Sequence, residues 1–157
     1  MSGSLVFGIG TQSNNALGAA VVYTANPDTG NFTTTYNSES YSDSFIDSGS
    51  NGYFFPDTAG ITECPGSTEQ GGFYCPSSTE NLSASNQGAN GTSGTVNFSI
   101  ANADTLFANE SAFVYSNLGG TFSGAFDWGL PFFFGQNVFV AIQGQSAPGG
   151  TAPYWAY

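Results

Sequence analysis

The sequence predicts a mostly β protein with one or two short helices. Short segments of alternating apolar and polar residues are separated by Gly-, Pro-, Asn- and Ser-containing turns, and little of the chain has the period of an amphipathic helix. Hydrophobic residues make up 39% of the chain and aromatic residues 16%, which is too apolar for a disordered acidic segment. A chain of 157 residues is expected to fold as one domain, spanning residues 1–157.

Short runs of β-forming residues mark the expected strands of the first half. These runs are residues 4–9, 18–25, 32–36, 41–46 and 53–55. Turn residues separate them, most clearly in Asn26-Pro27-Asp28-Thr29-Gly30 and in residues 37–40. Pro56 ends the last run, because proline has no N–H to give to a sheet. Asp47 is therefore expected in a loop between two strands.

The second half begins with a polar segment. Residues 77–94 are almost entirely Ser, Asn, Gly, Thr and Gln, which predicts a mobile surface loop. Residues 95–100 alternate as a strand, and Asn102 or Asp104 is placed to cap a short helix. The most apolar stretch, residues 126–142, is expected in the core, and aromatic residues 153–157 are expected to pair in a sheet.

Composition excludes several classes of function. The chain has no Lys, Arg or His against 11 Asp and Glu residues, giving a net charge of −11. Histidine-assisted nucleophiles, Schiff-base lysines and histidine metal sites are therefore impossible, so acid–base chemistry depends on carboxylates. Nucleic-acid binding is not expected without basic residues, and no apolar run is long enough for membrane insertion. Calcium binding is disfavoured because no D-x-D-x-D-G loop occurs.

The two cysteines, Cys64 and Cys75, lie 11 positions apart across a Pro-, Gly- and Ser-rich loop. We expect them to form a disulfide. A metal-binding pair is the alternative, and the lack of His or further Cys disfavours it.

The segment Phe45-Ile46-Asp47-Ser48-Gly49-Ser50 carries the clearest chemical pattern of the chain. Two apolar residues anchor a buried strand, glycine permits a tight turn, and hydroxyl and N–H groups are available to the Asp47 carboxylate. The alternative interpretation is an ordinary turn, since Asp, Ser and Gly are common turn residues.

Several segments, in this order, resemble the C-terminal lobe of a pepsin-like aspartic peptidase. Residues 3–8 (GSLVFG) are similar to the strand that opens that lobe, and residues 45–50 (FIDSGS) resemble its active-site motif. A cysteine pair follows, and residues 127–133 (DWGLPFF) with 137–140 (NVFV) resemble its closing strand, short helix and strand. A closer resemblance is to an uncharacterised family of secreted proteobacterial proteins with two D-[ST]-G-S motifs, one in an upstream half.

The resemblance implies a single pepsin-like lobe, a β-barrel or sandwich in which Asp47 is a catalytic aspartate. It implies that Ser48-Gly49-Ser50 supplies the turn glycine and the hydroxyls that buttress the carboxylate, and that Trp128 and Gly129 support the site from a neighbouring strand. Asp47 would act with a second aspartate to activate water against a peptide or protein substrate, without metal or cofactor. That aspartate would come from a missing N-terminal lobe, which we favour, or from a second copy in a homo-oligomer.

A lone monomer is expected to be inactive, so the sequence does not decide whether the chain is an enzyme. The alternative function is a non-catalytic secreted β domain for binding, adhesion or filament assembly, because a lobe without its partner exposes apolar and edge-strand surface. The surface composition of Ser, Thr, Asn, Gln and Gly is typical of a secreted or periplasmic protein, although residues 1–4 lack the positive flank of an export signal.

Overall fold

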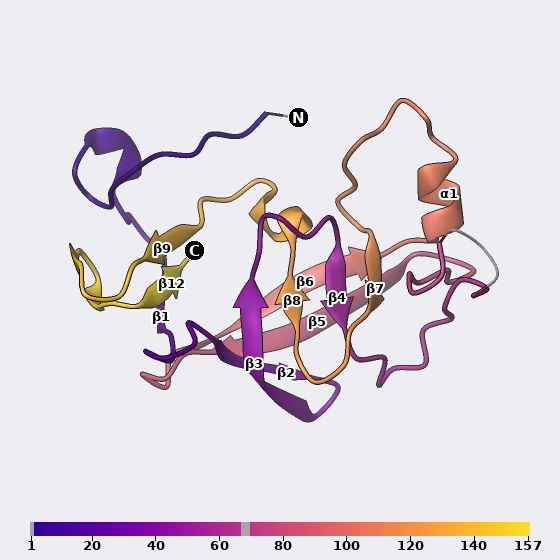
Figure 1. Ribbon diagram of the computed structural model, residues 1–157, viewed down its shortest axis with the longest axis horizontal. Coiled ribbons are helices and arrows are strands. Elements are labelled where there is room, and N and C mark those ends of the chain that lie inside the picture. The colour runs from indigo at the N-terminus through magenta and orange to yellow at the C-terminus, as the bar shows by residue number, and fades with distance from the viewer. Residues whose placement is uncertain (1, 67–69) are drawn as a thin grey trace.

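The structure is a computed structural model that describes residues 2–66 and 70–157 (Figure 1). Its strands are β1 (Val22–Thr24), β2 (Phe32–Tyr36), β3 (Glu39–Ile46), β4 (Tyr53–Phe55), β5 (Glu80–Gln87), β6 (Ser93–Ile100), β7 (Gly119–Thr121), β8 (Asp127–Trp128), β9 (Phe139–Ala141), β10 (Ser146–Ala147), β11 (Gly150–Thr151) and β12 (Tyr154–Ala156). Its helices are α1 (Ala103–Phe107) and the 3₁₀ turns η1 (Ser13–Asn15) and η2 (Leu130–Phe133). The mostly β prediction is confirmed.

Within the described residues, a seven-stranded sheet has the order β6-β5-β2-β3-β8-β4-β7, and a three-stranded sheet has the order β1-β12-β9. Figure 1 shows the smaller sheet beside one end of the larger one. β8 lies between β3 and β4 although it follows both in the chain, and it runs parallel to β3 and antiparallel to β4. This insertion brings a late segment of the chain next to the loop that holds Asp47.

Several expected elements are confirmed with small changes of length. β2 and β4 have the predicted bounds, β1 is shorter than residues 18–25, and β3 begins earlier, at Glu39. Asn102 caps α1, accepting the Thr105 N–H at 3.1 Å. The C-terminal strand is also confirmed, since β12 pairs with both β1 and β9.

The strand expected at residues 4–9 is wrong. This segment has no strand partner and runs along the surface, with Leu5 84% and Phe7 87% exposed. Its apolar composition suits a strand, but a strand also needs a neighbour for its backbone hydrogen bonds, and none lies beside it in the described structure.

The loop expected at residues 77–94 is also wrong over most of its length. Residues 80–87 form β5, which pairs with β6 along its whole length and with β2 on its other side. The polar composition made this strand hard to predict, because Leu82 is the one large apolar residue at its inward positions, beside the small Ala84 and the amide Asn86.

Aromatic side chains fill the core. Phe126 stacks on Phe55 with ring centroids 4.8 Å apart and on Trp128 at 4.3 Å, and Phe98 meets Phe126 and Trp128 edge-on. The core role expected for residues 126–142 is therefore confirmed at their start. Near their end buried and exposed residues alternate: Ala141 belongs to the core of the smaller sheet, whereas Val140 is 50% and Ile142 69% exposed.

A buried hydrogen-bond network fixes β8 to the centre of the sheet. Thr34 Oγ1 donates to Asn86 Oδ1 at 2.7 Å, and Trp128 Nε1 lies 3.1 Å from both oxygens. Asn86 Nδ2 donates in turn to Tyr157 Oη at 3.1 Å. Because these buried groups satisfy one another, Trp128 has one favourable position.

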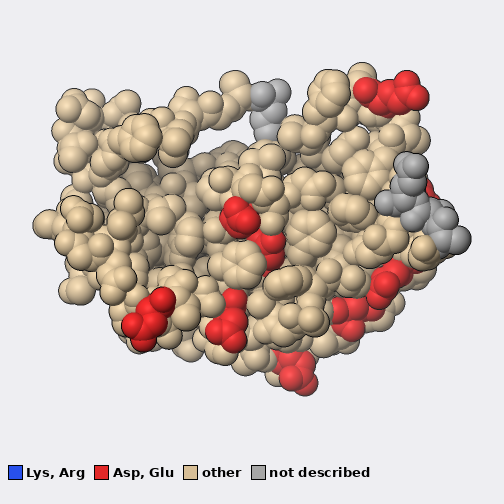
Figure 2. Space-filling model, in the orientation of Figure 1, with Lys and Arg blue, Asp and Glu red and all other residues tan. Residues whose placement is uncertain are grey.

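Acidic side chains are scattered over the face seen in Figure 2, and no basic side chain lies among them. Asp127 is the one acidic residue of the described chain that is buried. None of the helices in residues 2–66 and 70–157 has the length and apolar character needed to cross a bilayer.

Candidate active site

Asp47 lies directly after β3, in the turn that leads to β4, as the sequence predicts. Its backbone N–H donates to Trp128 O at 3.1 Å, so β8 holds the backbone of the aspartate itself. The Ser50 N–H donates to Asp47 O at 3.2 Å and closes the turn. The position of Asp47 is therefore fixed from two directions.

Gly129 lies where the chain leaves β8 beneath this turn. A Cβ atom at Gly129 would lie 2.0 Å from Gly52 O and 2.7 Å from Ser50 O, closer than any side chain allows. The next N–H, of Leu130, donates to Ser50 O at 2.7 Å. A glycine is thus required for β8 to approach closely enough to hold the turn.

The Asp47 carboxylate is exposed and is held by its own turn. Oδ1 accepts the Gly49 N–H at 2.7 Å, and Ser50 Oγ lies 3.4 Å from Oδ2. Ser48 is exposed, and its hydroxyl makes no hydrogen bond to Asp47 in the described structure. Of the hydroxyls expected to buttress the carboxylate, Ser50 is the one in contact.

A second carboxylate, Asp127, lies on the other side of Ser50. Ser50 Oγ donates to Asp127 Oδ2 at 2.5 Å. Asp127 is 6% exposed, and its Oδ1 is buried without a hydrogen-bond partner among the described residues. Asp127 was not predicted as a member of the site. The available signal was a lone acidic residue between Phe126 and Trp128, in the most apolar stretch of the chain.

Burial raises the pKa of Asp127 from its ordinary 3.8 to about 6. The hydrogen bond from Ser50 lowers the pKa in part, and the negative charge of Asp47 raises it further. Desolvation is the largest of these effects because the carboxyl group is buried, and the chain has no Lys, Arg or His side chain to offset it. Asp127 is thus partly protonated under mildly acidic conditions.

The two carboxyl groups have different access to solvent and substrate. Asp47 is exposed and can touch a bound molecule, whereas Asp127 is buried and reaches Asp47 only through the Ser50 hydroxyl. The chain therefore presents one accessible carboxylate with a buried acid behind it. No direct pair of carboxyls sharing one proton is formed by the described residues.

A family model described as "Protein of unknown function (DUF3443)" matches residues 1–157 of the chain. The chain belongs to this family. Comparisons with curated proteins and with solved structures found no match.

This DUF3443 chain contains the expected disulfide, between Cys64 and Cys75 with an S–S distance of 2.07 Å. The two sulfurs and the Asp104 carboxylate form a cluster of three potential metal ligands within the described residues. Joined sulfurs are not thiolates, however, so the cluster lacks the donors that a thiolate metal site needs. The disulfide itself indicates an oxidising compartment.

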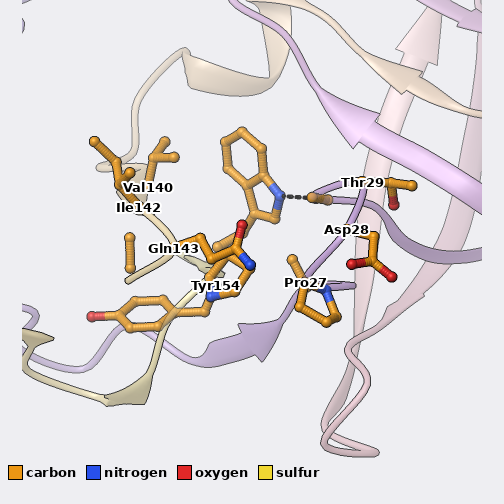
Figure 3. A pocket seen from close by; sticks show the side chains of 12 residues that line it. Pro27, Asp28, Thr29, Val140, Ile142, Gln143 and Tyr154 are labelled. Carbon is orange, nitrogen blue, oxygen red and sulfur yellow. Dashed lines mark hydrogen bonds between the residues drawn. The ribbon is translucent and has the colours of Figure 1, made fainter. Parts of the chain in front are cut away.

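The DUF3443 chain also has an open pocket of about 300 Å³ at the smaller sheet, between the turn 26–30 and strands β9 and β12 (Figure 3). Figure 3 shows Val140 and Ile142 opposite Pro27 and Asp28. Trp155 lines it, and its Nε1 donates to Gly30 O at 3.0 Å. Neither Asp47 nor Asp127 lines this pocket, so it lies outside the carboxylate site.

Proposed function

We propose that the Asp47 turn is one half of an aspartic-peptidase-like active site. The observation that carries the proposal is the insertion of β8 between β3 and β4, with Gly129 beneath the turn and the Trp128 carbonyl on the Asp47 N–H. In the pepsin-like lobe that the sequence resembles, a glycine-bearing strand lies beside the aspartate loop and fixes it. The contacts of Gly129 and the Trp128 carbonyl with the Asp47 turn support the proposal.

The chemistry needs two accessible aspartates that hold one proton between them. Two like charges about 3 Å apart cannot both ionise cheaply, so one carboxyl stays protonated. The ionised member activates a water that attacks the peptide carbonyl, and the protonated member donates to the carbonyl oxygen. This chemistry requires no metal or organic cofactor.

Asp127 does not meet the requirement for the second catalytic aspartate. At 6% exposure it cannot contact a peptide, and the Ser50 hydroxyl separates it from Asp47. The partner aspartate is therefore assigned to an N-terminal lobe encoded upstream or, as the second choice, to another copy of this chain. A secreted or periplasmic location is part of the proposal, and the disulfide supports it.

The test is hydrolysis of an unfolded protein substrate between about pH 3 and pH 6. It uses this chain over a range of concentrations and, separately, the longest product of its gene. Asp47→Asn is expected to reduce the rate by at least about a thousandfold, because it removes the proton-sharing carboxylate. Asp43→Asn is the matched control, since Asp43 is an exposed aspartate on β3 itself and is expected to leave the rate unchanged.

A rate that rises more steeply than protein concentration identifies a two-fold dimer as the source of the second aspartate. Activity confined to the longer gene product identifies an upstream lobe. Absence of cleavage in every form, or cleavage that persists in Asp47→Asn, overturns the proposal.

A second candidate is a non-catalytic binding or assembly domain. Large apolar side chains on the surface favour it: Phe113 is 90% exposed, Phe7 87%, and Ile142 69%. Exposed aromatic and aliphatic groups of this size are typical of surfaces that another protein covers where they form a contiguous patch. Polymers or stable complexes formed equally by the wild-type chain and Asp47→Asn, without cleavage, support this candidate over the peptidase.

A further inference from the structure

The Ser50 hydroxyl lies between two carboxyl groups and has one hydrogen to donate. Its oxygen is 2.5 Å from Asp127 Oδ2 and 3.4 Å from Asp47 Oδ2. A hydroxyl donates one hydrogen bond and accepts up to two, whereas an ionised carboxylate can only accept. If both aspartates are ionised, they compete for the single hydrogen of the Ser50 hydroxyl. The shorter distance shows that Ser50 then donates to Asp127.

The surroundings of Asp127 disfavour its ionised form on geometry alone. Its Oδ1 is buried with no donor among the described residues, so a negative charge there is only half solvated by hydrogen bonds. Its register partners are Phe45 on β3 and Phe54 on β4, which offer no side-chain hydrogen bond. The charged group that acts on it is Asp47, of the same sign, and the chain has no cation.

The remaining titratable group next to this position is Tyr53, which pairs with Trp128 across β4 and β8. Burial raises the pKa of Tyr53 to about 12, so its phenol stays neutral throughout the acidic range. Asp127 is therefore the group at this site whose pKa is raised into the mildly acidic range.

We propose that Asp127 is a positioning residue that sets the direction of the Ser50 hydroxyl. When Asp127 is protonated, its own O–H donates to Ser50 Oγ, and the Ser50 hydrogen turns to the Asp47 carboxylate. When Asp127 is ionised, Ser50 donates to Asp127 and Asp47 loses this hydrogen bond. The proton that Asp127 gains or loses is exchanged with water, and no proton passes between the two aspartates. The Ser50 hydroxyl keeps its hydrogen and changes only its acceptor.

This inference deepens the proposed function, because it gives the catalytic turn a built-in preference for acid. The catalytic carboxylate is oriented by two donors, the Gly49 N–H and the Ser50 hydroxyl, only while Asp127 carries a proton. The titration of Asp127, with its pKa near 6, then defines the upper edge of the range in which Asp47 is fully oriented.

The test is an NMR titration of the whole chain with ¹³C-labelled aspartate, from about pH 3 to pH 8 without substrate. The Asp127 carboxyl resonance is expected to shift near pH 6. The Asp47 carboxyl resonance is expected to show a second step at the same pH, because its hydrogen bond from Ser50 is lost there. Absence of that step in the wild-type chain overturns the proposal without any mutation.

Two serine variants separate the hydroxyl from simple charge repulsion. Ser50→Ala is expected to reduce the second step at Asp47 by at least about half, since only the through-space effect of the Asp127 charge remains. Ser48→Ala is the matched control and is expected to keep the step, because Ser48 makes no hydrogen bond to Asp47. A step of unchanged size in folded Ser50→Ala overturns the proposal.

Asp127→Asn gives a second measurement if Ser50→Ala fails to fold. It is expected to abolish the second step at Asp47 altogether, and persistence of the step contradicts the proposal. Since the readout needs no substrate, the reversal can be found in a chain that cleaves nothing. Conversely, if the chain cleaves peptides but the Asp47 resonance shows no second step, the proposed function stands and the role of Asp127 is rejected.

Discussion

At Gly129 a single added Cβ atom would collide with the backbone of the Asp47 turn. Its missing side chain lets β8 lie against the carbonyl oxygens of Ser50 and Gly52, and those contacts hold the Asp47 turn. Both neighbours are backbone atoms, which cannot move aside as the end of a flexible side chain does.

Gly129→Ala is accordingly expected to destabilise the fold by about 3 kcal/mol or more, because the new methyl group forces the turn and β8 apart. Urea unfolding followed by tryptophan fluorescence measures the loss. Gly3→Ala is the control, since nothing lies within 4 Å of a Cβ there, and its effect is expected to stay below about 0.5 kcal/mol. Equal stability of the two variants contradicts the close approach.

Residues near one another in sequence were the predictable part of the site. Asp47, Gly49 and Ser50 belong to one turn, and short-range chemistry is enough to link them. Asp127 was not predictable from its own neighbourhood. It joins the site because a strand more than 70 positions later pairs with β3, and pairing between distant strands leaves no local mark in the sequence.

At the scale of elements, β5 shows how a polar strand is held in a core. Asn86 on this strand is fully buried, and its side chain bonds to Thr34, Trp128 and Tyr157. The hydrogen bonds to these partners offset the cost of removing the amide from water.

Asn86→Ala is expected to reduce the free energy of unfolding by about 3 kcal/mol, because it leaves the buried Trp128 and Thr34 groups without their shared acceptor. Thermal or urea unfolding is the measurement. Asn81→Ala, at an exposed position of the same strand, is expected to change stability by less than about 0.5 kcal/mol. A small effect at Asn86 refutes the structural role of the network.

Composition and pairing explain which elements the sequence predicts. β2 and β4 are short, aromatic and bounded by turns, and both were predicted with their observed bounds. Residues 4–9 have the same character and form no strand, while polar residues 80–87 do. Both wrong predictions have the same cause. Whether a segment forms a strand depends on the presence of a neighbouring strand, which cannot be predicted from composition.

At the scale of the whole molecule, one buried acid in a chain without cations sets a pH dependence. The pKa of Asp127 is near 6 in the folded state, against 3.8 for an ordinary aspartate. Between these values the folded chain keeps a proton that the unfolded chain releases. The folded state therefore binds more protons, and the free energy of unfolding falls as pH rises through this window.

We expect this loss to be on the order of 3 kcal/mol between about pH 4 and pH 6, with a plateau above. Urea unfolding at several pH values measures it. Asp127→Asn is expected to flatten the profile and to be more stable than the wild type at pH 7, because the amide carries no charge to bury. Asp43→Asn is expected to keep the wild-type profile, and a wild-type stability that rises from pH 4 to pH 6 contradicts the assignment.

The place of β8 in the sheet also determines when the Asp47 turn can fold during synthesis. The ribosome releases β3 and β4 before β8, the strand that lies between them in the folded sheet. Until β8 and Leu130 are made, the Asp47 N–H and the Ser50 carbonyl lack the partners that they have in the folded chain, the Trp128 carbonyl and the Leu130 N–H. A nascent or truncated chain that stops before Asp127 thus carries Asp47 without β8, and any reactivity that depends on the organised turn waits until β8 has been made.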